Sequence, residues 1–144
     1  MASADLSTPI FTALMGNSGI VSALPDYSTA KTVFTARPVP KDAGYPMILS
    51  AGDVVRTNQD FINDPVHVAT RDISIFGQND TPAHLRAVES LALMVFDLFH
   101  RQRQSLSVPG WRVLDIVCKG PIVGPVDDDT SVHRVVTLTA RLSQ

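Results

Sequence analysis

The chain has 144 residues, a length that suits one domain and is short for two. Its net charge of −2 is unlike that of a strongly basic nucleic-acid-binding protein. A single cysteine, Cys118, excludes an intramolecular disulfide and an all-cysteine zinc site. Charged residues make up 18% of the chain, against roughly 25% in average soluble domains, so we expect partners to cover part of the surface.

Neither a signal peptide nor a membrane span is expected from the sequence. The first eight residues lack the basic-then-apolar pattern of a signal peptide. The longest apolar run, Leu91 to Phe96, is far shorter than the ~20 residues of a membrane span. We therefore expect synthesis in a reducing cytosol, no membrane partner, a flexible start over residues 1–7 and a single domain over 1–144.

A short helix is predicted near the N-terminus. Ser7 or Thr8 can serve as its N-cap, and Pro9 suits its first turn. Gly16 or Gly19 would end it.

Three strands are predicted after this helix. They cover residues 33–39, 47–56 and 66–77. Ile73 and Ile75 share one face of the third strand and should be core. The mixed polarity of its other face suggests a register shift near Thr70. The polar residues 57–65 predict a loop before this strand.

The clearest element is a helix from Thr81 to Arg103, with Thr81 as N-cap and Pro82 at the first helical position. Apolar residues recur along it with the helical period, namely Leu85, Val88, Ala92, Val95, Phe96 and Phe99. Leu91, Met94 and Leu98 widen the stripe. Leu91, Leu93 and Leu98 cannot all face one sheet. The helix is therefore either buried on most sides or in contact with another subunit.

Two strands close the chain, over residues 111–119 and 131–142. In the last strand Val136, Leu138, Ala140 and Leu142 share one face, and the strand is expected at a sheet edge that is open to pairing with another subunit. The predicted fold class is α+β, with a mostly antiparallel sheet packed against one long helix in the order α-β-β-β-α-β-β.

No catalytic or metal-binding pattern stands out. The four histidines are scattered singly, Cys118 has no neighbouring base and should be a small buried thiol, and Asp127 to Asp129 should form an acidic turn rather than a calcium loop. We therefore expect no enzyme, cofactor or metal site. A small enzyme or ligand-binding domain remains an alternative, and it would require His67, Asp72 and His133 to meet in space.

The candidate functional residues are instead interface residues, namely Arg56, Phe61, Ile62, Leu91, Leu98 and Arg101. Phe61 and Ile62 stand among polar residues, so their loop either folds back onto its own core or forms an arm that reaches a neighbouring subunit. The preference for Arg over Lys also suits subunit interfaces.

Several short motifs occur in a distinctive order along residues 7–142. They are Phe11-Thr12-Ala13-Leu14, Arg37-Pro38-Val39-Pro40, Gly44-Tyr45-Pro46-Met47-Ile48, Arg71-Asp72-Ile73-Ser74-Ile75-Phe76 and Asp80-Thr81-Pro82. With the order of elements around them, they resemble the tail terminator, or tail-completion, proteins of long-tailed bacteriophages and related gene-transfer particles.

This resemblance implies a structural virion protein without catalysis or cofactor. Its subunits would form a homohexameric ring that stops growth of the tail tube and offers a surface for head-tail joining. Its partners would be copies of itself, the tail tube protein and a head-completion or connector protein, and DNA would pass through the lumen without sequence-specific binding. It would be made in the host bacterial cytoplasm and sit at the head-proximal end of the tail.

Another head-tail connector or a tail-tube protein is the alternative within the same class. Tube-forming proteins usually need a long β-hairpin arm, for which the stretch from Arg56 to Val66 is available.

Overall fold

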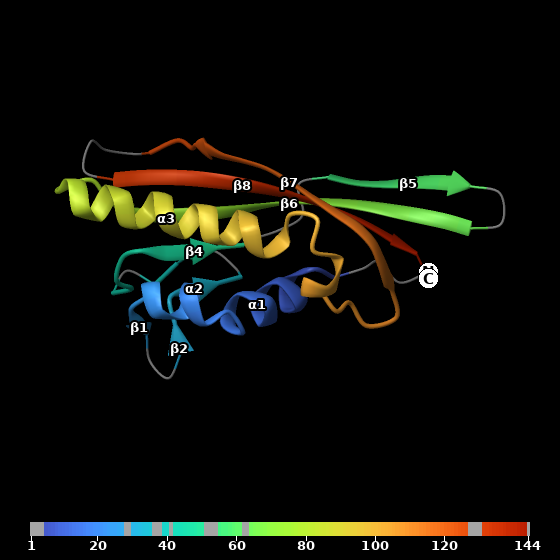
Figure 1. The fold of residues 1–144 in the computed structure, drawn as a ribbon, viewed down its shortest axis with the longest axis horizontal. Coiled ribbons are helices and arrows are strands. Elements are labelled where there is room, and N and C mark those ends of the chain that lie inside the picture. The colour runs from blue at the N-terminus through green and yellow to red at the C-terminus, as the bar shows by residue number, and fades with distance from the viewer. Residues whose placement is uncertain are drawn as a thin grey trace.

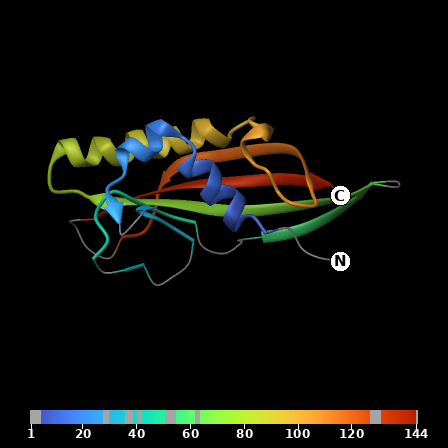
Figure 2. The same cartoon turned by 90° about the horizontal axis from the view of Figure 1, so that it is seen from below.

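The chain forms one large, mostly antiparallel sheet with its helices on one face, and a separate sheet of two short strands (Figures 1 and 2). The computed structural model describes residues 5–27, 30–35, 39–40, 42–50, 55–61, 64–126 and 131–143, with the backbone alone described at 55–61 and 64–65. The predicted α+β class, a mostly antiparallel sheet packed against one long helix, is confirmed.

Two short helices precede the strands, α1 (Ser7–Met15) and α2 (Ser18–Ala23). The N-cap of α1 is Leu6, so the prediction of Ser7 or Thr8 at that position is wrong. The Ser7 N–H instead donates to Asp5 Oδ1 at 2.9 Å. Gly16 directly follows α1, as predicted.

The long helix α3 (Pro82–Phe99) begins as the sequence predicts. Thr81 is its N-cap, and its Oγ1 accepts the His84 N–H at 3.2 Å. The helix ends at Phe99, four residues before the predicted end, because Arg101 takes a left-handed conformation with φ of 59°. A short 3₁₀ helix, η1 (Arg103–Ser105), follows.

The strands form two sheets. They are β1 (Asp26–Tyr27), β2 (Ala30–Lys31), β3 (Val33–Phe34), β4 (Met47–Leu49), β5 (Val55–Phe61), β6 (Asp64–Gln78), β7 (Arg112–Val123) and β8 (Ser131–Ser143). Strands β1 and β2 pair as a small separate sheet. The main sheet has six strands in the order β3-β4-β6-β8-β7, with β5 also paired to β6. Its β3–β4 pair is parallel and its other pairs are antiparallel.

The polar segment predicted as a loop is largely a strand. Strand β5 pairs with β6 from Val55↔Thr70 to Phe61↔Asp64. The loop prediction failed because strands were predicted from alternating apolar residues, which this polar segment lacks. Its strand is instead defined by backbone pairing with β6.

The last strand, β8, lies inside the sheet between β6 and β7, so its predicted edge position is wrong. Its pairing with β6 is unbroken from Val66↔Ser143 to Gln78↔Ser131, which also contradicts the register shift predicted near Thr70. The irregularities lie in β7, where the register shifts between Val113 and Asp115 and between Lys119 and Ile122.

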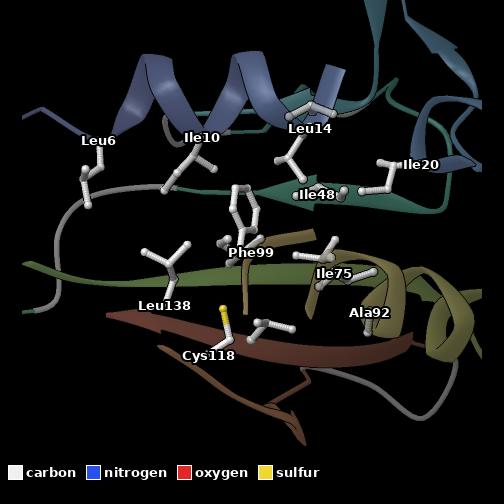
Figure 3. Packing of buried hydrophobic residues seen from close by; sticks show 14 of the residues in the cluster. Leu6, Ile10, Leu14, Ile20, Ile48, Ile75, Ala92, Phe99, Cys118 and Leu138 are labelled. Atoms are coloured by element: carbon white, nitrogen blue, oxygen red, sulfur yellow. The ribbon is translucent and has the colours of Figure 1, made fainter. Parts of the chain in front are cut away.

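The core lies between the sheet and its helices (Figure 3). Side chains of α1, such as Ile10 and Leu14, face Ile48 of β4 and Phe99 of α3. All four are fully buried. The predicted core residues of β6, Ile73 and Ile75, are buried as well. The four residues that share one face of β8 are also buried, namely Val136, Leu138, Ala140 and Leu142. Each Leu-sized side chain contributes about 1.5–3 kcal/mol by leaving water.

Candidate subunit interface

The first candidate surface is the β5–β6 hairpin. Arg56 pairs with Ala69 and Phe61 with Asp64, while Ile62 lies outside the described residues. The pairing of β6 with β8 begins at Val66, opposite Ser143 near the C-terminal end of β8. The hairpin around Phe61 therefore extends beyond the end of β8 (Figures 1 and 2). Among the described strands, β5 pairs with β6 alone. The segment is therefore a hairpin with one edge available for contacts, and its role as an arm stays a prediction.

The second candidate surface is the side of α3 that faces away from the sheet. Leu91 is fully buried in the core with Val95 and Phe99, so the prediction that it contacts another subunit is wrong. Leu98 is half-buried and lines a groove with Met94 and Asn17. Leu93 is 54% exposed. The helix is thus buried on one face, with nine of its 18 residues exposed, and Leu93 leaves a small apolar area on the exposed side.

Arg101, the third candidate, lies at the outer edge of β7. Its Nη1 atom is 3.7 Å from Asp115 Oδ2, and its backbone N–H donates to the Ile116 carbonyl oxygen at 2.9 Å. The adjacent His100 accepts the Cys118 N–H on its Nδ1 atom at 3.1 Å. The turn after α3 therefore occupies the middle of this sheet edge and prevents another strand from pairing there. The exposed guanidinium of Arg101 remains available to a neighbour.

Sequence reasoning missed an exposed aliphatic cluster at the far end of β7. Ile122, Val123 and Val126 are 59%, 75% and 47% exposed. The backbone here is held to β8, because the Gly124 N–H donates to the His133 carbonyl oxygen at 2.9 Å. The His133 ring stacks on Phe76 with its Nδ1 atom 2.8 Å from the Pro125 carbonyl oxygen. Three aliphatic residues between Pro121 and Asp127 were the available sequence signal.

A buried arginine, Arg71, was also missed as a structural residue. Its Nε atom donates to Ser50 Oγ at 2.9 Å, and its Nη2 atom donates to the Ser50 carbonyl oxygen at 2.8 Å and to Ser7 Oγ at 2.9 Å. The signal was its position, since Arg71 shares the core face of β6 with Ile73 and Ile75. The side chain links the central strand to α1 and to the residue that follows β4.

The polar side chains required by the enzyme alternative do not converge. His67 lies edge-on to Trp111, Asp72 accepts a hydrogen bond from Thr137, and His133 stacks on Phe76. His67 and Asp72 are five positions apart on β6, which corresponds to about 16 Å. His133 pairs with Phe76, which lies four positions beyond Asp72, or about 13 Å away. Each of the three groups therefore has its own local partner.

Other candidate groups have structural surroundings. Cys118 is buried as predicted, and this burial raises the pKa of its thiol to about 12. Within the described ranges, no cluster of three His, Cys, Asp or Glu side chains could hold a metal ion. Residues 127–130 lie outside the described residues. No helix in the described part of the chain is long and apolar enough to cross a bilayer.

Comparison with known proteins gives one informative result. No protein-family model and no curated protein matches the sequence. Among solved structures, the fold is similar to a chain of the "Virion of native gene transfer agent (GTA) particle", with a TM-score of 0.76 and 14% sequence identity. The match covers 96% of this chain and 95% of that one. At this identity the similarity shows the shared fold.

Proposed function

We propose that the protein is a structural subunit of a phage-like particle, in which it forms a hexameric ring that ends the tail tube and joins the tail to the head. The observation that carries this proposal is the similarity to a gene transfer agent virion chain over nearly the full length of both chains. A match that covers 96% of this chain concerns the whole fold rather than one part of it.

The surfaces support an assembly function rather than chemistry. Among the described strands, the outer edge of the hairpin has no partner, and aliphatic side chains are exposed at the end of β7. The two histidines and the aspartate of the enzyme alternative lie apart. The proposed partners are further copies of the chain, a tail tube protein and a head-completion protein. DNA would pass through the ring without sequence-specific contacts. The proposed location is the head-proximal end of the tail.

One observation favours a second candidate function in the same class. The stretch from Arg56 to Val66 lies in a β-hairpin, which is the feature that a tail-tube protein would use to stack its rings. A tail-tube or other connector protein is therefore the alternative.

Native mass spectrometry over a concentration series, with negative-stain images, tests the two candidates. Single annular particles of six 15.6 kDa subunits support the ring that ends a tube. Rings that stack into long tubes support the tail-tube alternative. A chain that stays monomeric at all concentrations, and also when mixed with tail tubes of its own particle, contradicts both.

A further inference from the structure

A basic groove lies at the end of the sheet where β7 begins. Its lining includes Arg103, Arg112 and Trp111, and its volume is ≈ 520 Å³. Both arginines are exposed, and neither forms an ion pair with any residue that the structure describes. None of the described lining residues is acidic. Two guanidinium groups without a counter-charge favour an anionic ligand, and carboxylates match their geometry.

The rest of the lining defines what kind of anion fits. Gln104 and Ser107 add an amide and a hydroxyl, while Leu106, Val113 and the indole of Trp111 add apolar surface. The groove therefore suits a ligand that presents carboxylates beside aliphatic groups.

The same chain carries such a segment at the opposite end of the sheet. There β7 ends, β8 begins, and Ile122, Val123 and Val126 are exposed. The seven residues that join the two strands in sequence, 124–130, include three consecutive aspartates, Asp127 to Asp129. The negative charge of this segment complements the two arginines of the groove, and its exposed aliphatic side chains complement the apolar lining.

The groove and this segment of one molecule cannot meet. They lie at the two ends of β7, which has 12 residues and runs along the long axis of the molecule (Figure 1). A strand of that length spans about 35 Å. Contact between them therefore requires two molecules.

We infer that the groove around Arg103 and Arg112 binds residues 122–129 of a second copy of this chain. The contact joins two different surfaces, so each copy can bind one neighbour at each end, and such contacts close into a ring when the rotation between copies permits. This inference deepens the proposed function and rests on it for the closure of the ring. The contact between two copies is tested separately from ring formation.

Trp111 is the one tryptophan of the chain and lines the groove, so its fluorescence reports occupancy directly. The full chain is titrated with a peptide of residues 122–131 and with a control peptide in which Asp127, Asp128 and Asp129 are Asn. We expect a saturable change in Trp111 emission with the acidic peptide, at least roughly tenfold weaker binding of the control, and weakening in roughly 0.5 M salt.

Charge-reversal variants locate the binding site. Arg103→Glu and Arg112→Glu should each weaken binding of the acidic peptide by at least about tenfold. Arg86→Glu makes the same change of net charge at an exposed position of α3 outside the groove and should leave binding unchanged.

Three results would overturn the inference: no emission change with the acidic peptide, equal binding of the control peptide, or equal effects of all three variants. A response to short duplex DNA without a response to the peptide would also overturn it, because the groove would then bind nucleic-acid phosphate. If the peptide binds while the chain stays monomeric, both alone and with tail tubes, the contact stands and the ring fails. If rings form unchanged when all three aspartates are Asn, the ring stands and this contact is wrong.

Discussion

The Arg71 Nη2 atom lies 2.9 Å from Ser7 Oγ, which joins the central strand to the first residue of α1 across 64 positions of sequence. The same side chain also bonds Ser50 through its Nε and Nη2 atoms. Because Arg71 is 2% exposed, these bonds form away from water, where an unmet hydrogen-bonding group is costly. This single side chain therefore couples three segments of the fold.

Replacing Arg71 by Met should destabilise the fold. The change leaves the Ser50 carbonyl oxygen and two hydroxyls without their donor, and each unsatisfied buried group costs about 1–3 kcal/mol. Urea unfolding measures the loss. Arg112→Met removes an exposed arginine and should change the free energy of unfolding by less than about 0.5 kcal/mol. Equal effects of the two variants would contradict the role of Arg71.

Two glycines allow a test of backbone strain against steric contact. Gly110 and Gly120 both have positive φ, but a Cβ on Gly110 meets nothing within 4 Å, whereas one on Gly120 lies 2.7 Å from the Val135 carbonyl oxygen. Gly110→Ala should cost about 1–2 kcal/mol through conformation alone. Gly120→Ala should cost about 1–3 kcal/mol more, because β7 must shift from β8. Thermal unfolding of both variants gives the difference, and equal losses would show that β7 yields without cost.

The core face of α3 is tested by two aromatic residues. Phe99 is fully buried, so Phe99→Ala should cost about 3–5 kcal/mol. Phe96 is half-buried and stacks on the His100 ring at 4.6 Å between centroids, so Phe96→Ala should cost less. Denaturant midpoints of the two variants decide the ranking. A larger loss at Phe96 would mean that the helix is rotated relative to the sheet.

The N-terminus of α3 predicts a small pH effect. A hydrogen bond from the His84 ring lowers the pKa of Asp80 below its ordinary value of 3.8. Because the folded-state pKa is the lower one, the pair stabilises the fold above about pH 4 and loses this contribution as the pH falls through the folded-state pKa. An NMR titration should show the Asp80 pKa rising in His84→Ala. An unchanged value would exclude this hydrogen bond in solution.

The hairpin is tested by placing a charge at its end. Phe61→Asp or Ile62→Asp should leave the fold intact and prevent ring assembly, because a carboxylate at the contact would have to lose its water. Circular dichroism checks the fold, and native mass spectrometry checks the assembly. Ser90→Asp puts the same charge on an exposed site of α3 outside the candidate interface residues and should leave the rings intact. Rings of unchanged size in the Phe61 variant would contradict the arm.

Local signals in the sequence were sufficient for some elements. Thr81 and Pro82 located the start of α3 because capping involves residues that are neighbours in sequence. Alternation likewise sorted the residues of β8 into two faces, and the structure shows that the face with Val136 and Leu138 is buried. The end of α3 was predicted four residues late, since it depends on Arg101 bonding to Ile116 of a strand that follows later.

The position of an element in the sheet was not predictable in this way. Strand β8 became central because β6 pairs along its whole length, and no pattern within β8 reports that neighbour. Leu91 was misassigned as an interface residue because period alone cannot say how wide the covered face of a helix is. The basic groove was also missed, since it brings the turn after α3 to the start of β7.

The hydrogen bonds that His100 and Arg101 make to β7 also bear on aggregation. A fibre built by edge-to-edge strand pairing needs two open edges in every molecule. In this protein the middle of one outer edge is already occupied by the chain itself, and Pro121 offers no N–H farther along that strand. With the β7 edge blocked in this way, strand pairing between molecules would have to use the edges of β3 or β5, so the turn after α3 acts against the growth of β-fibres.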